Sequence, residues 1–582
     1  MKDAGIVQLA PVVRPAPLLA NPAMFKILTP LLLALLSGST FGQADSATPG
    51  DLGFEWNART AEHLINRAGF GARPEDVDRA VEMGFEAFLE TLFLPLSEQV
   101  PLKAATRKTK KDGVATEEGR RMEEAGGKEM ASEEMLNAAN DADRELRKAD
   151  RTQLEDYTLW WFDTMISGQD PLRDRMTLFW HGMFTSSMQD VKSSYQMIKQ
   201  NQLLRNGALG NYSGLLMEVA KDPAMLEYLD NDENKKSAPN ENFAREVMEL
   251  FTLGEGNYSE DDIKEAARAF TGWRSKEAEF SYIRRQHDNG TKTFLGVTGK
   301  LKGEDVLEIL LEQPACGEYV AARILNYLEG VPPSAERKTQ YGALFSSSGY
   351  DVELLLRELF QDPAFYRDEI VGNRVMGPVD FLVGSARRLD VMPPRAWLLS
   401  GSQLLGQRLF HPPSVKGWDG GMTWITTASL MQRGNLAGLL VGQIAVEDVL
   451  SSDLPEYQME DGEEMGGEVE DRDAKRKVGK LGELGGLKKI QGRWHPMLHL
   501  SGGAARAGAR SDAEVVDYLM GLLLAVEAGS DTRDWLVSQY VQMRGEAGLA
   551  RQRGRMQDRR EGEDVLASMA HLILSLPEAQ LN

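Results

Sequence analysis

Apolar side chains recur every three or four residues along most of the chain, which is the spacing of one face of an α-helix. Pro74 suits the first turn of a helix and Gly84 ends it, while Ser259 and Ser511 each open a capping box. The pattern therefore predicts a mainly α fold, a multi-helix globular domain with short loops.

One segment has strand character instead. Phe280, Tyr282 and Ile283 are strand formers, Asn289-Gly290 is a typical pair for a type I′ turn, and residues 291–294 can return. A small β-hairpin is therefore expected near residues 279–296.

Two stretches lose the helical period. Residues 97–151 are rich in Lys, Glu, Gly and Ala and predict a charged insertion of low order. Residues 453–510 predict an acidic, glycine-rich disordered segment, since residues 453–473 hold ten acids against one base. The ordered parts are then N-terminal helices in 45–96, a helical core with the hairpin in 152–450, and C-terminal helices in 511–582.

The first 44 residues predict a secretory signal. Met24 and Lys26 precede an apolar run over residues 27–36, and small residues follow as far as Ala44. The run is too short to span the ~30 Å hydrocarbon layer, so we expect export, cleavage after Ala44 and no stable membrane span. The alternative is an anchor that stays uncleaved. The residues before Met24 do not fit such a signal, so translation is expected to begin at Met24.

Charge and cysteine content exclude several classes. The 582 residues carry 66 Lys and Arg against 88 Asp and Glu, a formal net charge of −22. This argues against nucleic-acid binding, because each phosphate contact needs a basic side chain. Cys316 is the only cysteine, which excludes an intrachain disulfide and a four-cysteine zinc site. Any metal would be held by His, Asp, Glu and Asn.

The helix predicted after Pro171 becomes apolar nearly all round at its end, so His181 is expected to face the interior. Asp174 lies seven residues earlier on the same face. A buried histidine needs a hydrogen-bond partner, and His181 is either a structural histidine or a ligand.

Residues 230–241 resemble a calcium loop. Asp230, Asp232, Asn234 and Glu241 occupy positions 1, 3, 5 and 12 of an EF-hand pattern, but Lys235 replaces the glycine of position 6. The alternative is a polar loop in which Asn240 caps the next helix and Glu241 favours its dipole.

Glu246 lies at the edge of the apolar stripe of the helix after Asn240. Ion pairing among Glu241, Arg245 and Glu249 is one interpretation of its polar residues. A half-buried Glu246 would instead have a raised pKa and could accept a proton or bind a metal.

The predicted hairpin places His287, Asp288 and Lys292 close together. Three polar groups with different pKa values form a plausible site, although Asp before Asn-Gly is also ordinary turn chemistry.

Residues 407–424 combine paired prolines with three glycines and predict an irregular loop. Trp418 and Trp424 on this loop are either lids of the core or flat platforms for a sugar ring. Lys416 could pair with an anion or with a carboxylate of the protein.

The motifs at residues 240–254, 266–273, 287–296 and 412–418 resemble the bacterial family called domain of unknown function 1800. Residues 63–71 and 179–181 are similar to its earlier motifs. The resemblance implies an exported, largely helical protein that acts with a sulfatase-like partner of the family called domain of unknown function 1501. It assigns no catalytic residue.

Two functions are therefore considered. The first is a binding or accessory role on extracellular polymer, expected to be polysaccharide; its ligand contacts would be Asn240, Arg245, Trp273, Lys292, Lys416, Trp418 and Trp424. The second is a hydrolase that uses a divalent cation such as calcium, with Glu246, His181, His287 and Asp288 as catalytic candidates. Convergence of these four side chains in one cleft would favour the enzyme.

Overall fold

The structure is a computed structural model, and it describes residues 53–96, 133–445, 494–552 and 561–582. The predicted signal region, residues 97–132 of the predicted insertion and residues 453–493 of the acidic segment lie outside these residues. From Phe54 to Asn582 the chain forms one compact unit.

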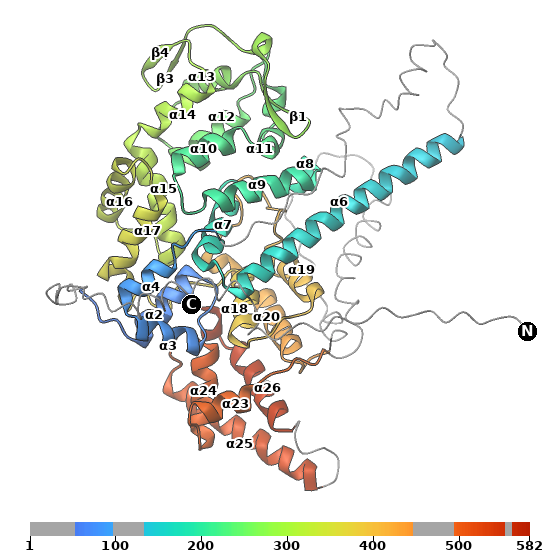
Figure 1. Ribbon diagram of the computed structural model, residues 1–582, viewed down its shortest axis with the longest axis vertical. Helices are drawn as coiled ribbons and strands as arrows, with labels where there is room; N and C mark the ends of the chain where they lie inside the picture. Colours follow the sequence, from blue (N-terminus) through green and yellow to red (C-terminus); the bar gives the residue numbers. More distant parts are fainter. Residues whose placement is uncertain (1–52, 97–132, 446–493, 553–560) are drawn as a thin grey trace, which may run out of the picture. The chain divides into compact units, whose positions relative to one another are not determined.

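Helices dominate the described chain, which confirms the mainly α prediction (Figure 1). Pro74 begins a helix that Gly84 follows, and both predicted capping boxes are present. The helical elements as far as Phe270 are α2 (Ala58–Ala68), α3 (Pro74–Met83), α4 (Phe85–Thr91), α6 (Glu133–Ser167), α7 (Pro171–Met183), α8 (Met188–Val191), α9 (Ser194–Gly207), α10 (Tyr212–Ala220), α11 (Pro223–Tyr228), η3 (Asn231–Glu233), α12 (Asn242–Glu246), the π-helix η4 (Val247–Thr252) and α13 (Glu260–Phe270).

Two small antiparallel sheets lie in the region of the predicted hairpin. They pair β1 (Trp273–Lys276) with β2 (Glu279–Tyr282), and β3 (Lys292–Phe294) with β4 (Val297–Gly299). The predicted turn at Asn289-Gly290 is wrong, because the strands turn at Glu277-Ala278 and Leu295-Gly296, where all four residues have positive φ. Asp288 instead accepts the N–H of Gly290 through Oδ1 at 2.7 Å, as in an Asx-turn.

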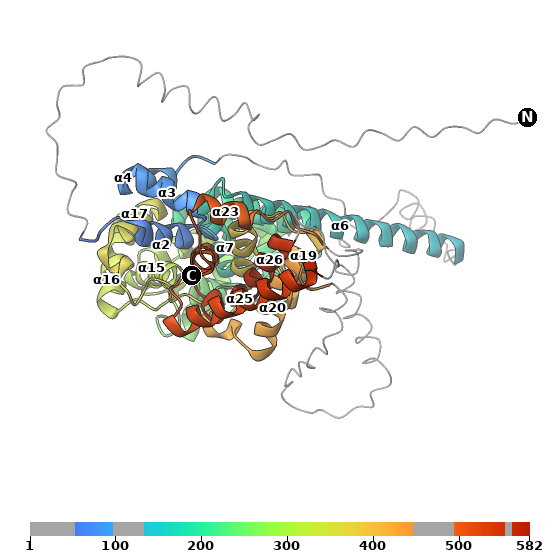
Figure 2. The same cartoon turned by 90° about the horizontal axis from the view of Figure 1, so that it is seen from below.

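The helical elements after β2 cover the remaining described chain. They are η5 (Arg284–Gln286), α14 (Gly303–Leu311), α15 (Pro314–Glu329), α16 (Ala335–Ser347), α17 (Val352–Gln361), η6 (Pro363–Tyr366), α18 (Pro378–Arg388), α19 (Arg395–Leu404), η7 (Gly421–Trp424), α20 (Thr427–Leu440), α23 (Leu500–Arg506), α24 (Asp512–Leu523), α25 (Ser530–Gln552), α26 (Glu561–Leu574) and η9 (Glu578–Gln580). Figure 1 shows α24, α25 and α26 packed together, and Figure 2 shows α26 beside α25 and α20.

Both predicted segments of low order contain helix in their described parts. Helix α6 begins at Glu133, inside the predicted insertion, and α23 lies inside the predicted acidic segment. Asp150 explains part of the difference: its carboxylate is buried and accepts hydrogen bonds from the backbone N–H and the hydroxyl of Ser194. A charged sequence can therefore be helical when tertiary partners satisfy its polar groups.

Helix α18 is buried along its whole length and contacts α6, α19, α20 and α24. The segment before it is held by the end of the chain, since Val375 forms an antiparallel bridge with Leu581. The N–H of Asn582 donates to the carbonyl oxygen of Arg374 at 2.9 Å. In the described ranges, none of the helices has both the length and the apolar character needed to cross a bilayer.

Candidate functional site

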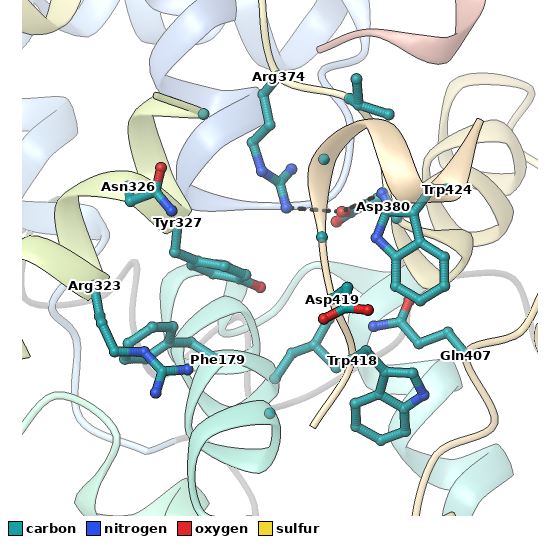
Figure 3. Close-up of a pocket in the computed structure, with 17 residues that line it drawn as sticks. Phe179, Arg323, Asn326, Tyr327, Arg374, Asp380, Gln407, Trp418, Asp419 and Trp424 are labelled. Atoms are coloured by element: carbon teal, nitrogen blue, oxygen red, sulfur yellow. Dashed lines mark hydrogen bonds and ion pairs between the residues drawn. The ribbon is translucent and has the colours of Figure 1, made fainter. Parts of the chain in front are cut away.

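A pocket of about 430 Å³, here called the central pocket, lies where four parts of the chain meet (Figure 3). These parts are α7, the end of α15, residues 374–380 at the start of α18, and the loop over residues 407–424. Its lining consists of Leu178, Phe179, Gly182, Arg323, Asn326, Tyr327, Gly330, Arg374, Val375, Gly377, Asp380, Gln407, Trp418, Asp419, Gly420, Gly421 and Trp424.

The loop is fixed against the end of α7. The hydroxyl of Thr185 donates to the carbonyl oxygen of Val415 at 2.7 Å. Gly417 has a φ of 81°, and a Cβ atom there would collide with the carbonyl oxygen of Gly182. Only glycine allows this close approach without strain, so Gly417 determines where the following Trp418 lies.

Two indole rings form one side of the central pocket. Trp418 and Trp424 are half-buried and line the pocket, and Figure 3 shows both on the side opposite Tyr327. Both rings are therefore partly open to the pocket. Trp273 is different: it is 1% exposed and packs against Phe270 and Phe280, so the prediction that it contacts a ligand is wrong.

An ion-paired group forms the floor. Asp380 is buried and pairs with both Arg175 and Arg374. Burial would raise the pKa of the Asp380 carboxyl, but the two guanidinium groups hold that pKa at about 2. Tyr327 lies beside this group, with its ring 5.2 Å from the guanidinium carbon of Arg374.

Arg323 lines the side of the pocket opposite the tryptophans, and a hydrogen bond to the π-helix η4 holds its guanidinium group. Its Nη1 donates to the carbonyl oxygen of Leu250 and to the hydroxyl of Tyr319, both at 3.2 Å. The Tyr319 hydroxyl also donates to Leu250, at 3.2 Å. A π-helix alters the positions of backbone carbonyls relative to an α-helix, and such segments are frequent at functional sites.

Sequence reasoning does not single out Arg323, Tyr327, Arg374 or Asp380. Arg323 and Tyr327 have the spacing of an ordinary amphipathic helix, and Asp380 after Gly377-Pro378 has the pattern of a capping residue. Gln407 and Asp419 lie within the loop that the prolines and glycines indicate. Among the segments that line the pocket, only that loop can be recognised from its local sequence as a candidate site.

His181 is buried, as predicted, and its Nε2 accepts the backbone N–H of Phe410 at 3.1 Å. Burial, and to a smaller extent the neighbouring His411, lower the pKa of His181 to about 3, so the ring is neutral. Its ring centroid lies 5.6 Å from that of Trp418. Asp174, on the same face of the helix, pairs with Arg205.

Glu246, Glu249 and Lys416 form a second polar group, to which the loop over residues 407–424 contributes Lys416. Lys416 Nζ lies 3.8 Å from a carboxylate oxygen of Glu249, and Tyr258 donates to Glu249 at 3.3 Å. Glu246 is half-buried, and burial followed by the negative charge of Glu249 raises its pKa. The predicted rise in the pKa of Glu246 thus agrees with its environment.

His287, Asp288 and Lys292 are engaged locally. His287 is buried with Nδ1 at 3.0 Å from the carbonyl oxygen of Thr271, and Asp288 pairs with Arg268 at 2.7 Å. Lys292 donates from Nζ to the carbonyl oxygen of Asp288 at 2.6 Å. Across the described ranges, no hydrogen bond, ion pair or ring contact joins these three residues to His181 or Glu246.

The oxygens of the predicted calcium loop also have protein partners. Asp232 accepts the N–H of Ser275 at 2.7 Å, and the Oδ1 atom of Asn234 accepts the N–H of Asn240 at 3.1 Å. The Nδ2 atom of Asn234 donates to the carbonyl oxygen of Ala267 at 2.9 Å. Asp230 begins the short helix η3 with a φ of 56°.

The end of the predicted calcium loop is ion-paired. Arg245 binds Glu241 at 3.5 Å and Glu260 at 2.9 Å. Within the part of the chain that the structure describes, no three His, Cys, Asp or Glu side chains are grouped to hold a metal ion. Calcium binding at this loop stays a prediction.

The comparisons with known proteins give one match. The sequence model of a family described as "Protein of unknown function (DUF1800)" matches residues 63–581, a span that contains the whole central pocket. No curated protein and no solved structure matches the chain.

Proposed function

The chain belongs to the DUF1800 family, and we propose that its central pocket binds one sugar unit of an extracellular polysaccharide. The observation that carries the proposal is the presence of Trp418 and Trp424 together in the lining of one pocket. The C–H faces of a sugar ring are apolar and pack against an indole, while its hydroxyl groups need polar partners at the rim.

Those polar partners are available. Asn326 and Asp419 line the pocket and are exposed, so they can exchange hydrogen bonds with sugar hydroxyls in place of water. The Oε1 atom of Gln407 accepts the N–H of Val379 at 3.0 Å, which fixes the orientation of this amide in the lining. A pocket that joins indole rings to amide and carboxylate groups suits a ligand with apolar faces and a polar edge.

Affinity electrophoresis of the full chain tests the proposal. Gels would contain xylan, laminarin, dextran or polygalacturonate, and Trp424→Ala would be compared with Trp535→Ala. Trp535 lies on α25, is 44% exposed and is not part of the pocket lining, so its removal controls for the loss of an indole. We expect at least one of these polymers to retard the wild type and Trp535→Ala but not Trp424→Ala. Equal migration of the three proteins in every gel would disprove the proposal.

The setting of this activity is also a proposal. It requires export, with a mature chain that begins near Asp45, and a polymer-processing partner of the sulfatase-like domain of unknown function 1501 family. Mass spectrometry of the protein secreted by its own host tests the first part. Co-migration of the two purified proteins in a polymer gel, compared with each alone, tests the second.

A second candidate is hydrolysis at the group of Glu246, Glu249 and Lys416. It is favoured by the grouping of a half-buried Glu246 with Glu249 and Lys416, whose Nζ lies 3.8 Å from Glu249, and by the raised pKa that burial and Glu249 give Glu246. Release of reducing ends from the retarding polymer, lost in Glu246→Gln and kept in Trp535→Ala, would support it. Unchanged polymer after prolonged incubation would leave binding as the function.

A further inference from the structure

Building on the proposed saccharide binding, we propose that the central pocket selects a sugar unit that carries an oxyanion group, a carboxylate or a sulfate. Arg323 and Arg374 would hold that group, while Trp418 and Trp424 contact the ring. The lining holds two arginines, Arg323 and Arg374, and two carboxylates, Asp380 and Asp419, and further buried guanidinium groups lie behind it.

Guanidinium groups gather in the floor of the pocket and directly behind it, where the nearby carboxylates are Asp380 and Glu329, the latter paired with Arg337. Arg175 and Arg374 both pair with Asp380, so one carboxylate serves two cations. Arg67 adds a third cation: it is 1% exposed, and its hydrogen bonds go to the neutral oxygens of Ile370 and Asn373. Within the described ranges, the Nε and Nη1 atoms of Arg67 have no hydrogen-bond partner.

The charge of Arg67 interacts with the charges of Arg374 and Arg175. Burial, and then the charges of Arg374 and Arg175, lower the pKa of Arg67 well below its ordinary value. These guanidinium groups therefore lie within electrostatic reach of one another. A buried excess of positive charge is unfavourable until an anion compensates it.

The wall of the pocket carries a further cation. Arg323 donates to the carbonyl oxygen of Leu250 and to the hydroxyl of Tyr319, which are both neutral. In the described part of the chain, no carboxylate lies within ion-pair distance of its guanidinium group. Figure 3 shows Arg323 and Arg374 on either side of Tyr327. An oxyanion beside Tyr327 would therefore have a guanidinium group on each side.

The chemistry of the two arginines fits such a group. A guanidinium presents a planar set of N–H donors, which matches the oxygens of a carboxylate or a sulfate. Asp419 would repel an anion from the rim, and Figure 3 shows it between Tyr327 and the tryptophans. The oxyanion is thereby directed toward the arginines, and Asp419 is left to accept sugar hydroxyls.

The test uses two matched pairs of polymers in affinity gels at constant ionic strength. Polygalacturonate is compared with its fully methyl-esterified form, and dextran sulfate with dextran. We expect the wild type to be retarded about tenfold more strongly by at least one charged polymer than by its neutral partner, the effect of one charged hydrogen bond. Retardation by the carboxylated or by the sulfated polymer distinguishes the two sources of the oxyanion.

Variants separate the pocket from general charge attraction. Arg323→Gln should lose the preference for the charged polymer and keep the retardation by the neutral one. Arg285→Gln, on the exposed helix η5, should behave as the wild type. Equal retardation of wild type by charged and neutral polymers, or an equal effect of the two variants, would overturn the inference. Absence of retardation in all four gels would instead disprove saccharide binding itself.

Discussion

The guanidinium group of Arg323 donates to the carbonyl oxygen of Leu250 at 3.2 Å, which connects the wall of the central pocket to the π-helix η4. The π-helix lies within the family motif over residues 240–254. No residue of this motif lines the pocket. A family motif that contributes no lining residue can therefore act on the pocket by positioning Arg323. Tyr319 completes this connection.

Tyr319→Phe tests the connection. The change removes a hydroxyl that accepts from Arg323 and donates to Leu250. We expect the free energy of unfolding to fall by about 0.5 to 1.5 kcal/mol, the net value of a hydrogen bond, and retardation by the charged polymer to weaken. Urea unfolding and affinity gels measure the two effects. Tyr540→Phe on α25 is the control, and an equal loss of retardation in both variants would contradict the connection.

Gly417→Ala should displace the loop that carries Trp418. Because φ at this position is 81° and a Cβ atom would collide with Gly182, we expect a loss of stability of about 2 to 4 kcal/mol. Gly420→Ala is a matched control in the same loop, since its φ is −164° and no heavy atom lies within 4 Å of the added Cβ. Thermal unfolding of both variants checks the prediction, which fails if their midpoints are the same.

Asp380→Asn should destabilise the protein by about 3 to 5 kcal/mol, because it leaves Arg175 and Arg374 buried without their carboxylate. The exposed pair of Asp517 and Arg533 provides the control, and Asp517→Asn should cost at most about 1 kcal/mol.

The paired Asp380 also predicts a dependence on pH. Its pKa is about 2 in the folded chain against an ordinary 3.8. The stabilisation is therefore complete above about pH 4 and is lost as the pH falls toward 2. Urea unfolding at pH 7 and pH 3 should show this loss in wild type and not in Asp380→Asn. Parallel losses in the two proteins would contradict the role of the pair.

His181→Gln should make the protein less sensitive to acid. The pKa of His181 is about 3 in the folded chain against 6.5 in the unfolded chain, so its contribution is complete above pH 6.5 and declines as the pH falls toward 3. At pH 4.5 this decline amounts to roughly 2 to 3 kcal/mol. His411 has a pKa lowered to about 3 as well, so part of the acid sensitivity remains. Urea unfolding at pH 7 and pH 4.5 compares the two proteins, and the same decline in each would refute the prediction.

Local sequence determined the helices and the loop that carries chemistry. Pro74 and the capping boxes at Ser259 and Ser511 begin helices in the structure as predicted, because an N-terminal cap depends on hydrogen bonds within four residues. The prolines and glycines of residues 407–424 likewise exclude regular structure locally, and the two tryptophans they present do line a pocket.

Tertiary structure decided everything that depends on distant partners. The strands turn at Glu277-Ala278, which has no turn signature, because pairing across the sheet outweighs the local preference of Asn289-Gly290. His181 receives its hydrogen bond from Phe410, which is 229 residues away, and not from its own helix. Arg323 and Arg374 become pocket residues only when α15 and the start of α18 pack beside α7, since nothing in their neighbouring residues distinguishes them from surface arginines.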